Sequence, residues 1–251
     1  MDDLKKIPND SCQIIIADPP YFRAIKEEWD NQWNSLEDYL NWSDKWIREC
    51  IRILKPGGTM YIYGFSETLA YIFVRIPINK KWLVWHYTNK NVPSLNFWQR
   101  SHESIICAWK GNKPIFNRDD VRVPYTDNFL KHSAGKIRPP TTGRFGSGKI
   151  TKYNANENGA LPRDVIDIPT LAGGSGRFEK VEHPTQKPLQ LCDTLIKASK
   201  NKNDENNIVL VPFVGSGSEC ISAIRNGCNF IGFEINKNYI KIAKKRIKDS
   251  S

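Results

Sequence analysis

Two segments that have the pattern of buried strands, far apart in the chain, each run directly into a loop of turn-forming and polar residues. The apolar residues 14–17 precede Asp18-Pro19-Pro20-Tyr21, and the apolar residues 208–211 precede a loop over residues 212–217. An apolar run bounded by turn residues is typical of a buried strand, and open α/β sheets bind their ligands at the carboxyl ends of such strands. We therefore expect both loops to line one crevice.

Strand-like and helix-like patterns alternate over most of the chain, which predicts an α/β fold with a doubly wound sheet. The predicted helices cover residues 29–54, 66–74 and 218–226, with others beginning near 188 and 238, and the predicted strands cover residues 14–17, 59–63, 82–87, 105–109, 208–211 and 230–233. The Lys-Pro-Gly-Gly sequence at 55–58 is expected to end the first of these helices.

The composition is that of a folded globular protein, with 39% hydrophobic and 25% charged residues among 251. No apolar stretch reaches the roughly 20 residues that span a bilayer, and the first residues lack a signal-peptide pattern. We therefore expect a cytoplasmic protein. The six cysteines contain no Cys-x-x-Cys pair and no zinc-like spacing with histidine, so we interpret them as buried thiols and expect no metal site.

Residues 119–180 differ in character from the rest, because apolar periodicity fades and eight of the 16 glycines lie between 128 and 180. This region looks like an inserted, loop-rich lobe. Between 128 and 163 it carries seven basic residues against one acidic residue, Glu157, and they alternate with Phe129, Phe145 and Tyr153. The basic residues are Lys131, Lys136, Arg138, Arg144, Lys149, Lys152 and Arg163. With a net charge of +10, such a segment suits contact with a nucleic-acid backbone; the alternative is an ordinary solvated loop.

The loop after residue 211 has the features of a nucleoside-binding turn. Gly215 and Gly217 allow a ligand to approach the main chain at a helix N-terminus, and Glu234, 17 residues after Gly217, is placed to bind ribose hydroxyls. Cys220 occupies the third position of Gly-x-Gly-x-x-Gly, which disfavours a dinucleotide. A smaller nucleoside-bearing ligand fits this turn better.

The loop after residue 17 combines acceptors with an aromatic ring. Pro19 and Pro20 remove two backbone donors, which leaves the Asp18 carboxylate and nearby carbonyl oxygens beside Tyr21. Such a loop suits a planar group that bears an amino function. The alternative is a rigid turn with a surface aspartate.

The order of these motifs resembles that of the β-class amino-methyltransferases of DNA. It runs through Asp18-Pro19-Pro20-Tyr21, Leu54-Lys55-Pro56-Gly57-Gly58, His102-Glu103, the basic region, His183-Pro184-Thr185-Gln186-Lys187-Pro188, Phe213-Val214-Gly215-Ser216-Gly217 and Glu234. The resemblance covers almost the whole chain and is weakest over 119–180. It implies a doubly wound, mostly parallel, Rossmann-like methyltransferase sheet, with a catalytic half at 1–118, a target recognition region at 119–180 and a cofactor-binding half at 181–251.

The resemblance also implies S-adenosylmethionine as cofactor, double-stranded DNA as partner and a role for individual residues. The catalytic residues are expected to be Asp18, Pro19, Pro20 and Tyr21. The cofactor-binding residues are expected to be Asp18, Thr185, Lys187, Phe213, Gly215, Ser216, Gly217, Ser218 and Glu234. The seven basic residues named above are the expected DNA-binding residues. Thr185 and Lys187 would hold the methionine carboxylate of the cofactor, although the His-Pro-Thr sequence could also be a plain helix cap.

The expected reaction is methylation of adenine N6 at a short site in duplex DNA. Asp18 and the Pro19 carbonyl would accept the N–H groups of an extruded base, and Tyr21 would stack on it. Cytosine N4 methylation is the alternative, and Asp rather than Ser at position 18 favours adenine in this family. An RNA or small-molecule methyltransferase is a third alternative, which the basic region disfavours.

Two departures from the family pattern motivate a further alternative, a DNA-binding relative with impaired catalysis. Val211 stands where the family usually has Asp before Pro212. Relatives commonly have a strand that ends in Gly-Asp ahead of the segment matching residues 1–10, so we expect a shortened N-terminus. The resemblance leaves open whether a restriction endonuclease accompanies the enzyme and whether it forms a homodimer.

Overall fold

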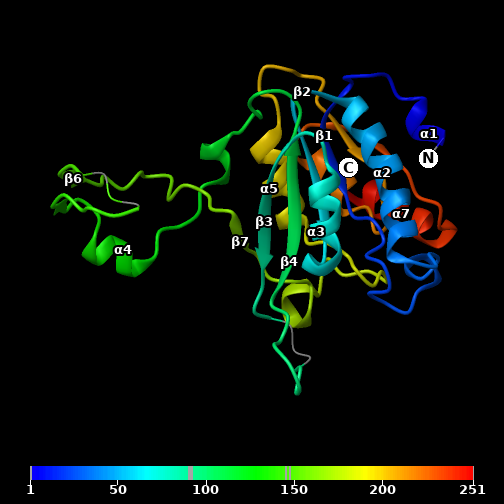
Figure 1. Ribbon diagram of the computed structural model, residues 1–251, viewed down its shortest axis with the longest axis horizontal. Helices are drawn as coiled ribbons and strands as arrows, with labels where there is room; N and C mark the ends of the chain where they lie inside the picture. The colour runs from blue at the N-terminus through cyan, green and yellow to red at the C-terminus, as the bar shows by residue number, and fades with distance from the viewer. Residues whose placement is uncertain (1, 90–92, 145, 147, 251) are drawn as a thin grey trace. The chain divides into compact units, whose positions relative to one another are not determined.

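The computed structural model describes residues 2–89, 93–144, 146 and 148–250. Its centre is a seven-stranded sheet with the strand order β7-β3-β4-β2-β1-β8-β9 (Figure 1). The strands are β1 Cys12–Ala17, β2 Leu54–Gly64, β3 Asn79–His86, β4 His102–Trp109, β7 Val165–Asp167, β8 Ile208–Val211 and β9 Asn229–Gly232. Only β4 runs antiparallel to its neighbours in this sheet, so the predicted doubly wound, mostly parallel architecture is confirmed.

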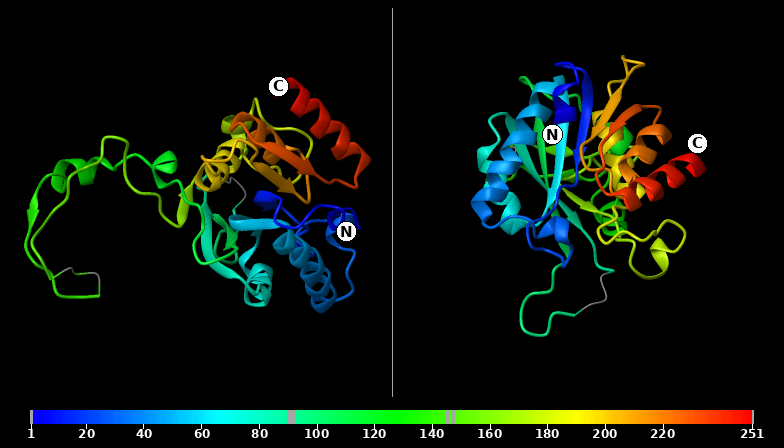
Figure 2. Two further views of the ribbon diagram at one scale, coloured as in Figure 1. Left: turned by 90° about the horizontal axis from the view of Figure 1, so that it is seen from above. Right: turned by 90° about the vertical axis from the view of Figure 1, so that its right-hand side faces the viewer.

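Helices cover both faces of the sheet. They are α1 Asp2–Lys5, α2 Leu36–Ile53, α3 Ser66–Arg75, α5 Leu189–Ser199, α6 Ser218–Arg225 and α7 Lys237–Ser250. Alternate residues of β1 enter different cores: Ile15 packs in the cluster of α2 and α3, and Ile14 and Ile16 pack in the cluster of α5. A central strand is therefore apolar at nearly every position, because both of its faces are covered (Figure 2).

The helix predicted over 29–54 is shorter than expected. It begins at Leu36, where the Ser35 hydroxyl accepts the Asp38 backbone N–H at 3.1 Å and the Asp38 carboxylate accepts the Ser35 N–H at 3.1 Å. This reciprocal capping box satisfies donors that would otherwise remain free at a helix start. Residues 22–34 instead form a loop with one short 3-10 turn, Glu28–Asp30. The other predicted elements are present with ends shifted by a few residues.

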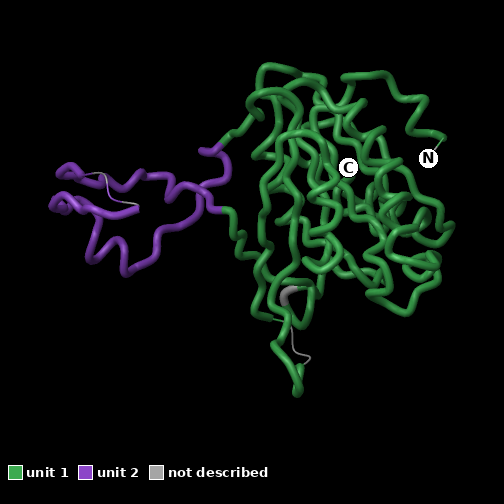
Figure 3. Tube along the Cα trace, in the orientation of Figure 1, with its two compact units in different colours: residues 1–117, 164–251 green, residues 118–163 purple. Residues whose placement is uncertain are grey.

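The chain divides into two compact units (Figure 3). The smaller unit comprises residues 118–163 and contains the short helix α4 Asp127–His132 and the two-stranded β5 Ile137–Arg138 and β6 Thr151–Lys152. Residues 164–180 pack with the larger unit, since β7 pairs with β3 and the Trp85 indole N–H donates to the Ile168 carbonyl at 2.7 Å. Within the described part of the chain, no helix has the length and apolarity needed to cross a membrane.

Candidate functional site

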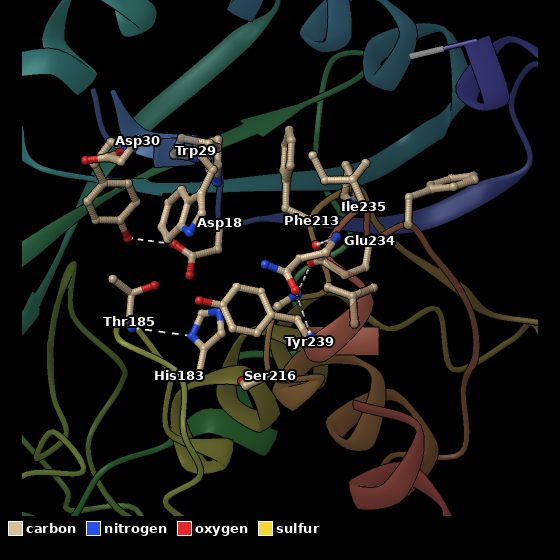
Figure 4. Close-up of a pocket in the computed structure, with 18 of the residues that line it drawn as sticks. Asp18, Trp29, Asp30, His183, Thr185, Phe213, Ser216, Glu234, Ile235 and Tyr239 are labelled. Atoms are coloured by element: carbon tan, nitrogen blue, oxygen red, sulfur yellow. Dashed lines mark hydrogen bonds between the residues drawn. The ribbon is translucent and has the colours of Figure 1, made fainter. Parts of the chain in front are cut away.

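The carboxyl ends of β1, β8 and β9 open onto one cavity of about 570 Å³. Asp18 follows β1 and Phe213 follows β8, and both line this cavity, so the expectation that the two loops share one crevice is confirmed. Figure 4 shows Asp18 on one side and Glu234 with Ile235 on the other, and Phe213 lies between them. The volume is in the range of ordinary small-molecule sites.

A buried cluster of charges surrounds Asp18. The Lys187 ammonium donates to Asp18 Oδ2 at 2.8 Å, donates to the Thr185 carbonyl at 3.1 Å and lies 3.7 Å from Glu103 Oε2. The Tyr21 hydroxyl lies 2.7 Å from Asp18 Oδ1 and 3.2 Å from Glu103 Oε2. Both oxygens of Asp18 are therefore held in fixed directions, and each keeps a further lone pair for a ligand.

Burial and mutual attraction set the protonation of this cluster. Burial alone lowers the pKa of Lys187, which is 2% exposed, but Asp18 and Glu103 offset that effect and its pKa lies above the ordinary value. Burial raises the pKa of Glu103, and Lys187 opposes that rise. Burial, together with the two nearby carboxylates, raises the pKa of Tyr21 well above 10. Lys187 stays charged and Tyr21 stays neutral at physiological pH.

Asp30 organises the backbone directly after the Asp18 loop. Its fully buried carboxylate accepts the backbone N–H groups of Tyr21 at 2.6 Å, Ala24 at 2.5 Å and Ile25 at 2.9 Å. Between them Phe22 and Arg23 have φ angles of 64° and 59°, which are uncommon for residues other than glycine. The three hydrogen bonds compensate for this unfavourable backbone and fix the position of Tyr21.

The glycine loop after β8 is shaped by close contacts. Gly215 has φ 48°, and a Cβ there would lie 2.7 Å from His183 Nε2. Gly217 has φ 83° and precedes α6, and a Cβ there would lie 3.1 Å from Ala243 Cβ. Glu234 bridges this loop to the end of β9 by accepting the Gly215 N–H at 2.7 Å. A side chain at either glycine would disturb this packing.

His183 contributes a neutral imidazole to the cavity wall. Burial lowers its pKa to about 4, and Asp18 only partly opposes that shift. Its Nδ1 accepts the Thr185 N–H at 3.4 Å, and its ring meets Tyr239 edge-on with ring centroids 4.5 Å apart (Figure 4). With Nδ1 accepting, Nε2 carries the proton and is the donor on the side of Gly215.

Most of the residues predicted for the site come together. The cavity is lined by Asp18, Pro19, Pro20, Tyr21, Thr185, Lys187, Phe213, Gly215, Ser216 and Glu234. Gly217 and Ser218 do not line it; Ser218 is fully buried, and its hydroxyl accepts from Arg246 at 3.2 Å. The motifs predicted to share one crevice are therefore adjacent in space, although far apart in sequence.

The seven predicted DNA-binding residues, Lys131, Lys136, Arg138, Arg144, Lys149, Lys152 and Arg163, are all exposed and all lie in the smaller unit. Aromatic residues of that unit pack on one another: Phe129 stacks on Tyr125 with centroids 4.7 Å apart, and Tyr153 meets Phe129 edge-on at 5.4 Å. Phe145 lies outside the described residues. The smaller unit therefore combines exposed basic side chains with a small aromatic cluster.

The sequence patterns did not single out several cavity residues. They are Trp29, Asp30, Glu219, Ile235 and Tyr239. Glu103, which belongs to one of the family motifs but had no predicted role, joins the charge cluster beside Asp18. Glu219 carried a detectable signal, because it is an acid within the apolar pattern of a predicted helix next to the glycine loop. Asp30 and Trp29 carried none, since they lay in the part of the chain predicted to be helical.

Over the described residues, no group of three or more His, Cys, Asp or Glu side chains could hold a metal ion. All six cysteines are free; five are buried and Cys107 is partly buried, close to the expectation of buried thiols.

Comparison with protein-family models places almost the whole chain in one family. A model described as DNA methylase, for the N6/N4 class, matches residues 12–245. A DNA adenine methyltransferase of Escherichia coli, YhdJ, is 33% identical over 259 residues, which cover 99% of this chain and 80% of that protein. The type II methyltransferase M1.MboII of Moraxella bovis is 31% identical, over 96% of this chain and 91% of that protein.

Two solved structures share the fold. PvuII DNA methyltransferase, described as cytosine-N4-specific, superposes with a TM-score of 0.68 at 14% identity and covers 98% of this chain and 86% of that one. M1.HpyAVI in complex with SAM gives a TM-score of 0.58 at 23% identity, with 98% and 93% coverage. At these identities the comparison supports the fold alone.

Proposed function

This chain belongs to the N6/N4 family of DNA methylases, and on that premise we propose that it methylates adenine N6 in duplex DNA with S-adenosylmethionine. Its membership of this family makes it a site-specific DNA amino-methyltransferase, and the proposal concerns the target base. The observation that carries the proposal of adenine N6 methylation is Asp18, whose carboxylate lines the cavity with both oxygens oriented by Lys187 and Tyr21.

The cavity fits S-adenosylmethionine in size and charge. Its volume of about 570 Å³ suits a ligand of this size. The carboxylates of Asp18, Glu103 and Glu219 all interact with the single ammonium of Lys187, which leaves an excess of negative charge for the sulfonium and ammonium groups of the ligand. Phe213 and Ile235 offer apolar surface to the adenine ring, and Glu234 keeps free lone pairs for ribose hydroxyls.

Asp18 would prepare the target amine. When bound, S-adenosylmethionine supplies an electrophilic methyl group on sulfur. The lone pair of an exocyclic amine is delocalised into its ring, and hydrogen bonds from its N–H groups to Asp18 and the Pro19 carbonyl favour a more pyramidal nitrogen. Lys187 and Tyr21 each donate to one Asp18 oxygen and hold the carboxylate in one orientation, so the acceptors need no reorganisation during transfer.

The target base would enter from extruded duplex DNA beside Tyr21. Extrusion costs a few kcal/mol. The Tyr21 hydroxyl points to Asp18 and Glu103, its ring meets Phe65 edge-on at 5.0 Å, and both residues line the cavity, which offers aromatic surface for a flat base. Asp rather than Ser at position 18 favours adenine over cytosine in this family, and a 33% identical relative named as an adenine methyltransferase supports the same choice.

Mass spectrometry of nucleosides tests the proposal. Duplex DNA incubated with the protein and S-adenosylmethionine should yield N6-methyladenine, and Asp18→Asn should reduce the yield at least ~100-fold because an amide presents one acceptor oxygen instead of two. Calorimetry with S-adenosylhomocysteine shows whether the variant still binds the cofactor product. N4-methylcytosine alone would instead identify a cytosine enzyme, and cofactor binding without any methylated base would identify an impaired relative.

A further inference from the structure

We propose that the Glu219 carboxylate binds the α-ammonium group of the methionine part of S-adenosylmethionine. This inference rests on the proposed function and assigns to one residue the recognition of one group of the ligand. Glu219 was not among the residues predicted to bind the cofactor.

Glu219 lies inside the cavity wall rather than at its rim. It is the second residue of α6, it is 3% exposed, and it lines the cavity together with Asp18, Lys187 and Ser216. Among the residues that the structure describes, its side chain bonds to one other side chain, the Cys192 thiol, at 3.6 Å from Oε1. A thiol is a weak donor, so the hydrogen-bonding capacity of this carboxylate is mostly unused.

The other buried and half-buried acids that line the cavity are already engaged. Among the described residues, Asp30 is the other fully buried acid that lines the cavity, and its oxygens accept three backbone N–H groups. Asp18 accepts from Lys187 and Tyr21, and Glu234 accepts backbone N–H groups of Gly215 and Asn236. Within the described part of the cavity, Glu219 therefore remains as the buried acid with no ion pair and with a single weak side-chain hydrogen bond, while the charges of Lys187 and Arg246 act on it from a greater distance.

Burying a carboxylate without a cation is costly, and that cost would be removed by a cationic ligand. Burial, and then the charge of Asp18, raise the pKa of Glu219 to about 7, while its own backbone N–H, Lys187 and Cys192 act in the opposite direction. Tyr63 on β2 and Arg246 on α7 also face this region. Arg246 donates to the Ser216 carbonyl at 2.7 Å.

The ligand's own chemistry matches this site. The α-ammonium group is a compact cation with three donors, and a carboxylate at the wall of a water-poor cavity binds such a group strongly. Since the free carboxyl is largely protonated below about pH 7 and ionised in the complex, binding should release a proton there. Affinity should rise as the pH increases from about 6 to about 7.5, because less work is then needed to ionise Glu219.

Titration calorimetry with two ligands tests the proposal directly. S-adenosylhomocysteine carries the amino-acid part, whereas 5′-deoxy-5′-methylthioadenosine lacks it. Glu219→Gln should weaken binding of the first ligand at least ~10-fold at about pH 7.5 and leave binding of the second unchanged within about twofold. Glu179→Gln is the matched control, because Glu179 is partly buried with a raised pKa but is not among the cavity-lining residues, and it should bind both ligands as the parent protein does.

A second measurement changes the ligand and uses the parent protein, so it remains valid if Glu219→Gln folds poorly. An analogue of S-adenosylhomocysteine without the α-amino group should bind the parent protein at least ~10-fold more weakly. Titrations of the parent protein at about pH 6.5 in buffers of different ionisation enthalpy should show release of the larger part of one proton with S-adenosylhomocysteine and almost none with the analogue.

The outcomes separate the role of Glu219 from the proposed function. Equal weakening of both ligands in Glu219→Gln, no weakening of either, or no proton release would overturn the role of Glu219 while methyl transfer by the parent protein still stands. A parent protein that binds no S-adenosylhomocysteine at all would overturn the proposed function itself.

Discussion

At the scale of single residues, the buried Lys187 ammonium is held by oxygens from three residues. It faces oxygens of Asp18, Thr185 and Glu103 at 2.8, 3.1 and 3.7 Å. A buried ammonium is tolerated only where such partners replace water. In this structure Lys187 is the counterion of Asp18, and its predicted contact with the methionine carboxylate stays a prediction.

Removal of the Lys187 ammonium should lower the free energy of unfolding. Lys187→Met leaves Asp18 and Glu103 without a buried counterion, and we expect the free energy of unfolding in urea to fall by about 3–5 kcal/mol. The double variant Lys187→Met, Glu103→Gln should recover part of that decrease, because one uncompensated charge is then gone. Equal stability of the two variants would show that Glu103 does not share the cation.

At the scale of elements, the loop between β1 and α2 positions the catalytic candidates. Asp30 closes it through three backbone hydrogen bonds around two residues with left-handed backbone, Phe22 and Arg23. The loop is also linked to α2, since the Tyr39 hydroxyl donates to the Pro20 carbonyl at 2.7 Å. The sequence pattern predicted a helix from residue 29, but the helix begins at Leu36. The Ser35 cap starts the helix there, and the Asp30 carboxylate instead of a helical carbonyl accepts backbone N–H groups of the preceding loop.

The variant Asp30→Ala should show whether Asp30 positions the catalytic loop or contributes to cofactor binding. Three N–H groups lose their acceptor, so we expect stability to fall by about 2–4 kcal/mol and kcat to fall at least ~10-fold, with KM for the cofactor changed less. Asp30→Asn keeps one acceptor oxygen and should fall between Asp30→Ala and the parent protein. Steady-state kinetics with thermal unfolding tests this, and a change confined to KM would contradict a positioning role.

At the scale of the whole molecule, the residues that line the cavity and the predicted DNA-binding residues lie in different units. The described residues that line the cavity all belong to the larger unit, and the seven exposed basic residues belong to the smaller unit. Because the two sets belong to different compact units, we expect substitutions in one set to leave the function of the other unchanged. We propose that the smaller unit supplies contacts to the DNA backbone, as the predicted target recognition region of residues 119–180 requires.

A triple variant in which Gln replaces Lys131, Lys136 and Arg138 should bind DNA more weakly and bind the cofactor as the parent protein does. If each side chain neutralises one phosphate, the slope of log K against log salt should become less steep by about 0.9 for each residue replaced. Fluorescence anisotropy at several salt concentrations measures the slope, and calorimetry with S-adenosylhomocysteine is the control. An unchanged slope would show that these residues form an ordinary solvated surface.

Local patterns along the chain were sufficient to predict six of the seven strands of the sheet, the glycine loop and the acceptor-rich loop, whereas β7 lies in the region predicted to be a loop-rich lobe. Residues 14–17 and 208–211 are apolar at every position because both faces of β1 and β8 are covered, and this constraint is visible in the sequence. Gly215 and Asp18 belong to loops at the ends of those strands, so their joint place in one cavity also followed from the topology.

The partners of the buried charges depended on the tertiary structure. Lys187 is 169 positions from Asp18 and Tyr21 is 82 positions from Glu103, and neither spacing predicts contact. Asp30 and Glu219 acquired their surroundings in the same way, since burial and the number of hydrogen bonds arise only when distant segments pack. Electrostatic free energy depends on distance and solvent exposure in space, whereas periodicity records only which side of an element faces the core.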